Sequence, residues 1–162
     1  SNPIKKTLLK DIENFFEKPV EVIIKSKNEL TISVDKVKIT FLHYPFPLIY
    51  SLKKENGKNI KLADVQEISL MKAYALGRRQ SFKDYVDMYA VVSKNFITLR
   101  SIIENSKNKY GEVFNDRVFL EQLVYTDDIE NEPIRWLDKA ISKEEIRFFF
   151  EIKIKEYFNM MQ

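Results

Sequence analysis

Apolar residues recur at helical spacing in the first part of the chain, and this spacing predicts a helix from Ile4 to Glu17. Pro19 ends that helix, because proline disfavours the helical conformation in the residue before it. Three runs rich in β-branched residues follow, at residues 20–25, 30–34 and 37–44. Each run predicts a strand, and the short polar breaks between them indicate hairpin turns.

The pattern changes after residue 45. Short extended pieces are expected at residues 48–52 and 60–62, on either side of an Asn56-Gly57 turn. From Asp64 onward the apolar period is helical, and Asp64 with Glu67 forms a capping-box pattern at the first helix. A second helix begins near Ser81. The helices expected after Asp64 run from 64 to about 75, and over 81–92, 96–106, 117–125 and 143–160.

Strands followed by helices predict an α+β fold. We expect a small antiparallel or mixed sheet on the N-terminal side, followed by a helical bundle. The sequence divides into residues 1–62, the α/β part, and residues 63–162, the helical subdomain, which together form one compact unit. If strands of the sheet are missing, one edge is open, and a homodimer through that edge is expected.

Composition narrows the class of protein. Of the 162 residues, 44% are apolar and 31% are charged, which is typical of a folded globular domain. The sequence has no cysteine, and this excludes disulfides, thiolate catalysis and cysteine-ligated zinc. No apolar run approaches the roughly 20 residues that span a bilayer, so we expect no membrane partner and a cytoplasmic location.

Two cations in the first predicted helices are candidates for binding phosphate. Lys72 and Arg79 are seven residues apart, and on a continuous helix they share a face. Arginine by its fork and lysine as a point charge could then clamp the phosphates of a nucleotide. The alternative is that both are solvated residues near a helix C-terminus, where the helix dipole favours cations.

The next helix opens with Lys83, Asp84 and Asp87, whose spacing places Asp87 on the same face as the other two. Asp84 has a simpler interpretation, because an acid at the third position after a Ser81 cap completes the helix N-terminus. A buried Asp87 paired with Lys72 or Arg79 is the ion pair that we expect under either interpretation.

Together these residues resemble the fourth motif of the AbiEii/AbiGii family of nucleotidyltransferase-like proteins. In that family a lysine is followed two turns later by an arginine, and a Lys-Asp-x-x-Asp segment then opens the next helix. Two more segments match in the right order. Residues 37–45 match a strand that ends in a Tyr-Pro turn, and residues 123–133 match an acidic segment.

The resemblance implies a nucleotidyltransferase-like fold and activity. In it Lys72 and Arg79 are the nucleotide-binding residues, and Lys83, Asp84 and Asp87 are the catalytic group. The implied reaction is Mg²⁺-dependent transfer of a nucleotide from a nucleoside triphosphate to an RNA or protein acceptor. The implied biological role is the toxin of a toxin–antitoxin system, with an RNA acceptor, an antitoxin or another protein as partner.

The sequence also departs from the family. The glycine-containing first motif and the paired aspartates of the second motif lie upstream in the family and have no counterpart in this sequence. Thr40 stands where the family has a third carboxylate, and Gln80 stands where it has a glycine. Nucleotidyl transfer needs carboxylates that hold Mg²⁺. Since the family's carboxylates have no counterpart in this sequence, we expect it to contain no metal ligands. We also expect no tight binding of Mg²⁺ or nucleotide, and no catalysis, by this chain alone.

Two other functions compete with nucleotide transfer. The apolar C-terminal helix suggests a non-catalytic protein-interaction module on the same scaffold, an interpretation that fails if this helix is wholly buried. A weaker alternative is RNA binding through surface lysines, several of which lie in the first helix and its neighbouring turns. Asp127, Asp128, Glu130 and Glu132 lack the spacing of a calcium loop and predict an acidic loop instead.

Overall fold

The computed structural model describes residues 3–55, 57, 59–76, 78–79, 81–129, 132–136 and 139–160. Asn56 of the expected turn, Gln80 and Glu130 lie outside the described residues. The chain is α+β and forms two compact units, Ser1–Phe46 and Pro47–Gln162. The sequence predicted this mixed α+β class, but it predicted that the two parts form one compact unit.

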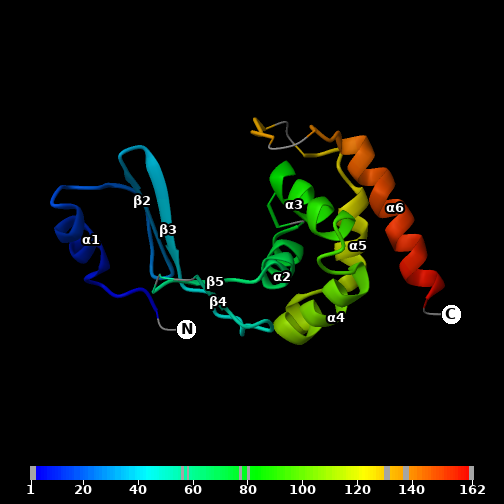
Figure 1. Ribbon diagram of the computed structural model, residues 1–162, viewed down its shortest axis with the longest axis horizontal. Coiled ribbons are helices and arrows are strands. Elements are labelled where there is room, and N and C mark those ends of the chain that lie inside the picture. The colour runs from blue at the N-terminus through cyan, green and yellow to red at the C-terminus, as the bar shows by residue number, and fades with distance from the viewer. Residues whose placement is uncertain are drawn as a thin grey trace. The chain divides into compact units, whose positions relative to one another are not determined.

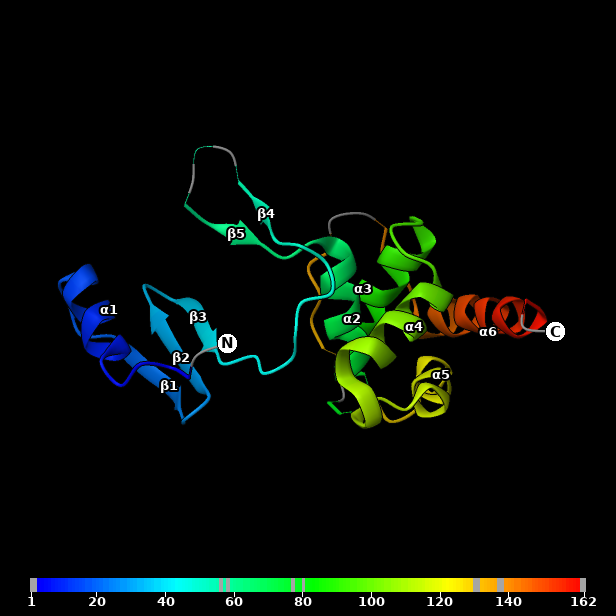
Figure 2. The ribbon, with the colours of Figure 1, turned by 90° about the horizontal axis from the view of Figure 1, so that it is seen from below.

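The first unit is a helix with a three-stranded antiparallel sheet. Helix α1 (Leu8–Phe16) precedes the strands β1 (Glu21–Lys25), β2 (Glu29–Val34) and β3 (Val37–Leu42), which follow one another across the sheet (Figure 2). All three strands were expected within two residues of their observed bounds. β1 and β3 are the edges of this sheet, so the open edge that the sequence predicted has two candidates.

One side of the sheet forms the core of this unit with α1. The buried side chains are Ile12 of the helix and Leu30, Ile32 and Val34 of the central strand. The helix begins four residues later than the sequence predicted, because residues 5–8 form a single turn in which the Leu8 N–H donates to the Lys5 carbonyl at 3.1 Å.

The second unit begins with a two-stranded ribbon and continues as helices (Figure 1). The short strands pair antiparallel, whereas the expected extended piece at residues 48–52 is not a strand. Helices α2 and α3 lie side by side, and α6 packs against α5 and α3. The elements are β4 (Lys53–Lys54), β5 (Lys61–Leu62), α2 (Val65–Ala75), α3 (Phe82–Ser93), α4 (Leu99–Tyr110), the 3₁₀ turn η1 (Gly111–Val113), α5 (Asp116–Val124) and α6 (Lys143–Asn159).

The start of α2 differs from the capping box that the sequence predicted. Asp64 does cap the helix, accepting from the Gln66 N–H at 2.9 Å. Glu67 does not return the bond, because its side chain is completely buried and accepts the backbone N–H groups of Ile49 and Tyr50, each at 3.0 Å. A complete capping box occurs instead at Ser142, where α6 begins.

Glu67 also explains where the boundary between the two compact units falls. Glu67 binds the backbone at residues 49 and 50, and Lys109 of α4 donates to both the Pro47 carbonyl and Glu67. Residues 47–50 are therefore held against α2 and α4. The division falls after Phe46, whereas the sequence placed it after residue 62.

The sequence predicted no segment that spans a membrane, and the helices of the structure can be compared with that prediction. Among the parts of the chain that the structure describes, no helix has the length and apolar character needed to cross a bilayer.

Candidate functional site

Asp84 is the centre of a cluster of ion pairs between α2 and α3. Its side chain is 1% exposed, and both of its oxygens accept hydrogen bonds. Arg79 donates from Nε to Oδ2 at 2.6 Å and from Nη2 to Oδ1 at 2.8 Å, and Lys72 donates from Nζ to Oδ1 at 2.7 Å. The simpler interpretation of Asp84 as part of a helix cap is wrong, because its carboxylate is used entirely by these cations and Ser81 makes no side-chain cap.

Lys72 joins this buried carboxylate to an exposed one. Its Nζ lies 2.6 Å from Oδ2 of Asp87, one turn further along α3. The expected pairing of Asp87 with Lys72 is therefore present. The expected burial of Asp87 is wrong: its side chain is 50% exposed, and Asp84 is the buried member.

Lys72 and Arg79 meet at Asp84 by a different route from the one that their spacing suggested. They do not share a helix face, since α2 ends at Ala75 and Arg79 lies in the turn that follows. That turn leads the chain back toward α3, so the guanidinium approaches Asp84 from the loop while the ammonium approaches from the helix.

Lys83 points to a different partner. Its Nζ lies 2.9 Å from Oε2 of Glu132, whose other oxygen accepts from Ser81 Oγ at 2.8 Å and from the Lys83 backbone N–H at 3.0 Å. Glu132 thus performs the N-terminal capping of α3. The sequence placed Glu132 in an acidic loop but gave no sign that it reaches a helix about fifty residues earlier.

Charge stabilises this arrangement. Burial alone would raise the pKa of Asp84, but the hydrogen bonds from Arg79 and Lys72 outweigh it, and the pKa lies below its ordinary value. Burial would likewise lower the pKa of Lys72, yet its bonds to Asp84 and Asp87 leave the pKa raised. The hydrogen bond to Asp84 raises the pKa of Arg79. The three groups are therefore ionised throughout the neutral range.

The pKa of Glu132 is lowered to about 2, chiefly by the backbone N–H of Lys83 and then by the Lys83 and Ser81 side chains. The carboxylate that fixes residue 132 to α3 is thus also charged at neutral pH.

The donor set does not fit a protein-bound Mg²⁺ ion. A magnesium site needs carboxylate oxygens that are open to the metal, and both oxygens of Asp84 already accept from cations. The described part of the chain also contains no group of three or more acidic or histidine side chains arranged to hold a metal. The cluster instead holds two cations against two carboxylates, and Arg79 is its more exposed cation, at 61%.

A groove of about 300 Å³ adjoins this cluster. It lies between α3 and residues 134–136, 139 and 141, and we call it the α3 groove. Asp87 belongs to both the cluster and the groove, and Lys72 is linked to the groove through its ion pair with Asp87. The side chains that matter for its chemistry are Lys83, Asp87, Tyr89, Arg135, Trp136 and Lys139.

The α3 groove combines aromatic rings with positive charge. Tyr89 packs edge-on against Phe149 of α6, with ring centroids 4.8 Å apart, so its ring is held in place. Trp136, the single tryptophan of the chain, is half-buried on the opposite wall. Sequence reasoning missed Trp136, since nothing in the local pattern around it indicates that it faces α3.

The chain is similar to a protein of a thermophilic bacterium. An uncharacterized protein of Aquifex aeolicus is 30% identical over 138 residues, which cover 85% of this chain and 66% of the relative. The chain thus spans just under two thirds of that protein's length. No family model matches the chain. No solved structure matches it either.

Proposed function

We propose that the ion-pair cluster and the α3 groove bind a nucleotide, in a protein of the nucleotidyltransferase-like class. The observation that carries the proposal is that buried Asp84 fixes two cations, Lys72 and Arg79, and that Lys72 also pairs with Asp87 of the α3 groove, which has an aromatic wall. Positioned cations suit phosphates, and a tryptophan or tyrosine ring offers a base a surface for stacking.

The donors of the two cations leave capacity for a ligand. An ammonium has three N–H groups and a guanidinium has five. Lys72 uses its ammonium on Asp84 and Asp87, and Arg79 uses two of its N–H groups on Asp84. The Arg79 side chain is 61% exposed, so its remaining N–H groups face solvent, from which an anion would come.

The proposal concerns binding, and this chain is not proposed to catalyse transfer alone. Asp84 is committed to the cations, and Asp87 by itself cannot hold the metal that the reaction requires. The acceptor and the role as a toxin rest on the resemblance to the AbiEii/AbiGii family. In that proposal, the nucleoside triphosphate carries Mg²⁺ and the acceptor is an RNA or a protein.

A thermal-shift titration with Mg²⁺ and each nucleoside triphosphate tests the binding. A ligand that binds only the folded state stabilises it by about 2.7 kcal/mol at a hundredfold excess over Kd. We expect one or more triphosphates to raise the melting temperature of the wild-type chain. The increase should be lost in Lys72→Ala and reduced in Trp136→Ala.

Arg100→Ala is the matched control. Arg100 is an exposed cation of the same unit and pairs with Glu104 at 2.8 Å in the same helix, so its removal tests the loss of a surface charge. Each variant is compared with and without ligand, because Lys72→Ala also weakens the α2–α3 junction. No shift with any triphosphate, or an equal shift in Lys72→Ala and wild type, would exclude this function.

A second function, binding of a protein partner, is favoured by the surface of α6. Ile146, Phe150 and Tyr157 are buried, whereas Phe148 of the helix and Met160, directly after it, are more than 60% exposed. The helix is therefore not wholly buried in the monomer, which was the condition for rejecting an interaction module.

The apolar surface includes a groove of about 460 Å³ between α5 and α6, lined chiefly by Leu120, Val124, Ile154, Tyr157 and Phe158. An apolar groove of this kind suits the apolar face of a partner helix. A photocrosslinker at residue 121 should capture one protein in cells, and Phe158→Asp should abolish the capture. Phe15→Asp, an equally polar change at an exposed phenylalanine of the other unit, should leave it unchanged.

A further inference from the structure

The first unit carries a second concentration of positive charge. A hollow of about 780 Å³ lies between the segment that leads into α1 and the turn from β1 to β2. Four lysines line it: Lys5, Lys6, Lys25 and Lys27. The remaining lining is Pro3, Ile4, Leu9, Ser26 and Leu30, so no carboxylate takes part. We call this hollow the lysine pocket.

None of these lysines forms an ion pair in the described part of this unit. The ion pair formed there is Lys18 with Asp35 at 2.7 Å, which involves none of the four. All four side chains are exposed, whereas Leu30 of the pocket lining is buried. The four positive charges around this pocket repel one another. An anion that enters is attracted by each of them and relieves that repulsion.

The backbone that carries two of the lysines is fixed. Ser26 Oγ accepts the N–H groups of Asn28 at 3.2 Å and Glu29 at 3.0 Å, and the Ser26 N–H donates to the Glu29 carbonyl at 2.8 Å. Lys25 and Lys27 flank this serine. Their stems therefore start from an ordered turn, which reduces the entropy lost when they bind a ligand.

We infer that the lysine pocket binds the phosphodiester backbone of a single-stranded nucleic acid. The pocket is far larger than one phosphate, and its charges come from two separate segments, which suits several phosphates in succession. Ile4, Leu9 and Leu30 supply an apolar floor for sugar carbons or a base.

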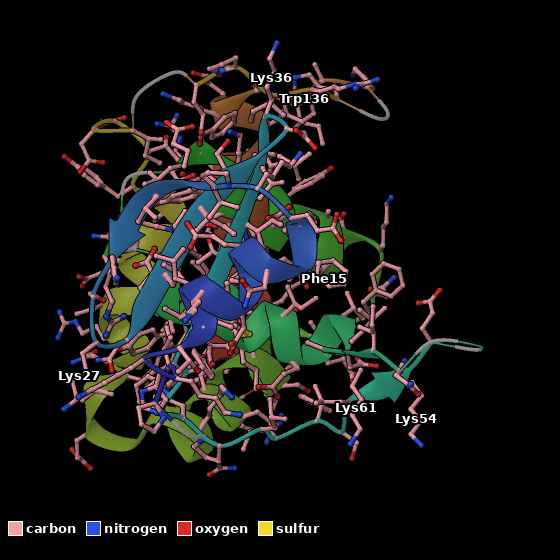
Figure 3. All side chains as sticks on the ribbon, turned by 90° about the vertical axis from the view of Figure 1, so that its left-hand side faces the viewer. Phe15, Lys27, Lys36, Lys54, Lys61 and Trp136 are labelled. Atoms are coloured by element: carbon pink, nitrogen blue, oxygen red, sulfur yellow. The ribbon has the colours of Figure 1, made fainter. Side chains whose placement is uncertain are left out.

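An anionic membrane fits this surface less well. Membrane-surface binding combines basic residues with an apolar side chain that inserts between lipids. Phe15, at 80% exposed, is the apolar side chain of α1 that could insert. Figure 3 shows Phe15 at one end of α1 and Lys27 beyond the other end, so the charge and the exposed ring do not form one patch.

Fluorescence anisotropy of a labelled single-stranded RNA of mixed sequence, titrated with the whole chain, tests the inference. Contact with four phosphates predicts a slope of log affinity against log salt of about −2.8, which is a loss of about 50-fold between 50 and 200 mM salt. In the double variant Lys25→Gln, Lys27→Gln the slope should fall to about half. Its affinity near 0.1 M salt should fall on the order of 25-fold.

The double variant Lys36→Gln, Lys38→Gln is the control, because it removes the same charge from exposed positions of the same unit that do not line the pocket. Figure 3 shows Lys36 well away from Lys27. It should reduce affinity by less than threefold. An equal loss in both double variants would show diffuse attraction and overturn the inference, as would the absence of salt-dependent binding.

Further measurements distinguish a nucleic-acid backbone from a lipid surface as the source of phosphate, and they test the two proposed sites independently. The same sequence as single-stranded DNA should bind similarly if only the backbone is recognised. Binding to vesicles of anionic lipid without binding to RNA would overturn the inference. Lys72→Ala should bind RNA as the wild type does, and the Lys25, Lys27 variant should keep any nucleotide-induced thermal shift, so either proposal can fail alone.

Discussion

Lys109 of α4 and Glu67 of α2 form an ion pair in which both side chains are completely buried. The ammonium also donates to the Pro47 carbonyl, and the second carboxylate oxygen accepts two backbone N–H groups from residues 49 and 50. One pair of charges thus holds two helices and an irregular segment together. A pair satisfied in this way is costly to break, because removing one partner leaves the other charge buried.

Lys109→Met should therefore destabilise the helical unit by about 3–5 kcal/mol. Lys107→Met is the control, since Lys107 pairs with Asp116 at the surface and should cost less than about 1 kcal/mol. Urea unfolding followed by circular dichroism measures both. Similar losses for the two variants would show that the buried pair contributes no more than a surface pair.

Acid should weaken the α2–α3 junction through Asp84. The pKa of this carboxyl is lower in the folded protein than its ordinary value of 3.8, so its contribution to stability is present above pH 4 and is lost as the pH falls through the folded pKa. Asp84→Asn should remove about 3 kcal/mol at pH 7, because Lys72 and Arg79 lose their shared partner. The stability difference between wild type and Asp84→Asn should shrink below pH 4, as measured by thermal melts across pH.

Acid should also weaken the capping of α3 by Glu132. Its pKa of about 2, against an ordinary value of 4.5, means that the capping of α3 is present above pH 4.5 and is lost as the pH falls toward 2. A carboxyl-detected NMR titration should place its midpoint near 2. In Lys83→Ala the midpoint should rise but remain below 4.5, since Ser81 and the backbone N–H still donate. A wild-type midpoint near 4.5 would show that residue 132 is not held on α3.

Alkali should act through Tyr85. Burial, and then the charges of Asp128 and Asp84, raise the pKa of this phenol to about 12 from an ordinary 10.0. The neutral phenol is favoured by the fold, so stability is complete below pH 10 and declines as the pH rises from 10 to 12. Tyr85→Phe should show a weaker decline across that window in thermal melts.

The elements of the fold were accessible from the sequence wherever periodicity was strong. The runs that became β1, β2 and β3 are rich in β-branched residues, and a two-residue break at Asp35 and Lys36 separates the last two. Both of these residues have positive φ, at 50° and 68°, as a tight hairpin turn requires. Local patterns of this kind depend on neighbouring residues, so a single sequence suffices to detect them.

The candidate site was accessible only in part. The sequence predicted the pair between Lys72 and Asp87, which the structure shows. It expected Asp87 to be the buried carboxylate and assigned Asp84 to a helix cap, because burial depends on how α2 and α3 pack and not on local spacing. Contacts over longer separations gave no signal. Glu67 and Lys109 are 42 residues apart, and the glutamate also completes a capping pattern in the sequence that the folded chain does not use.

The bonds from Glu67 to residues 49 and 50 decide where this protein can be cut. A fragment that starts at residue 63 would keep every helix of the second unit. In it, however, the buried Glu67 would lack two backbone N–H donors, and the buried Lys109 would lack the carbonyl that accepts from it. A fragment that starts at Pro47 keeps all of these partners. The shorter piece should therefore be poorly expressed and prone to aggregation, and the longer one is the piece to isolate for study of the α3 groove by itself.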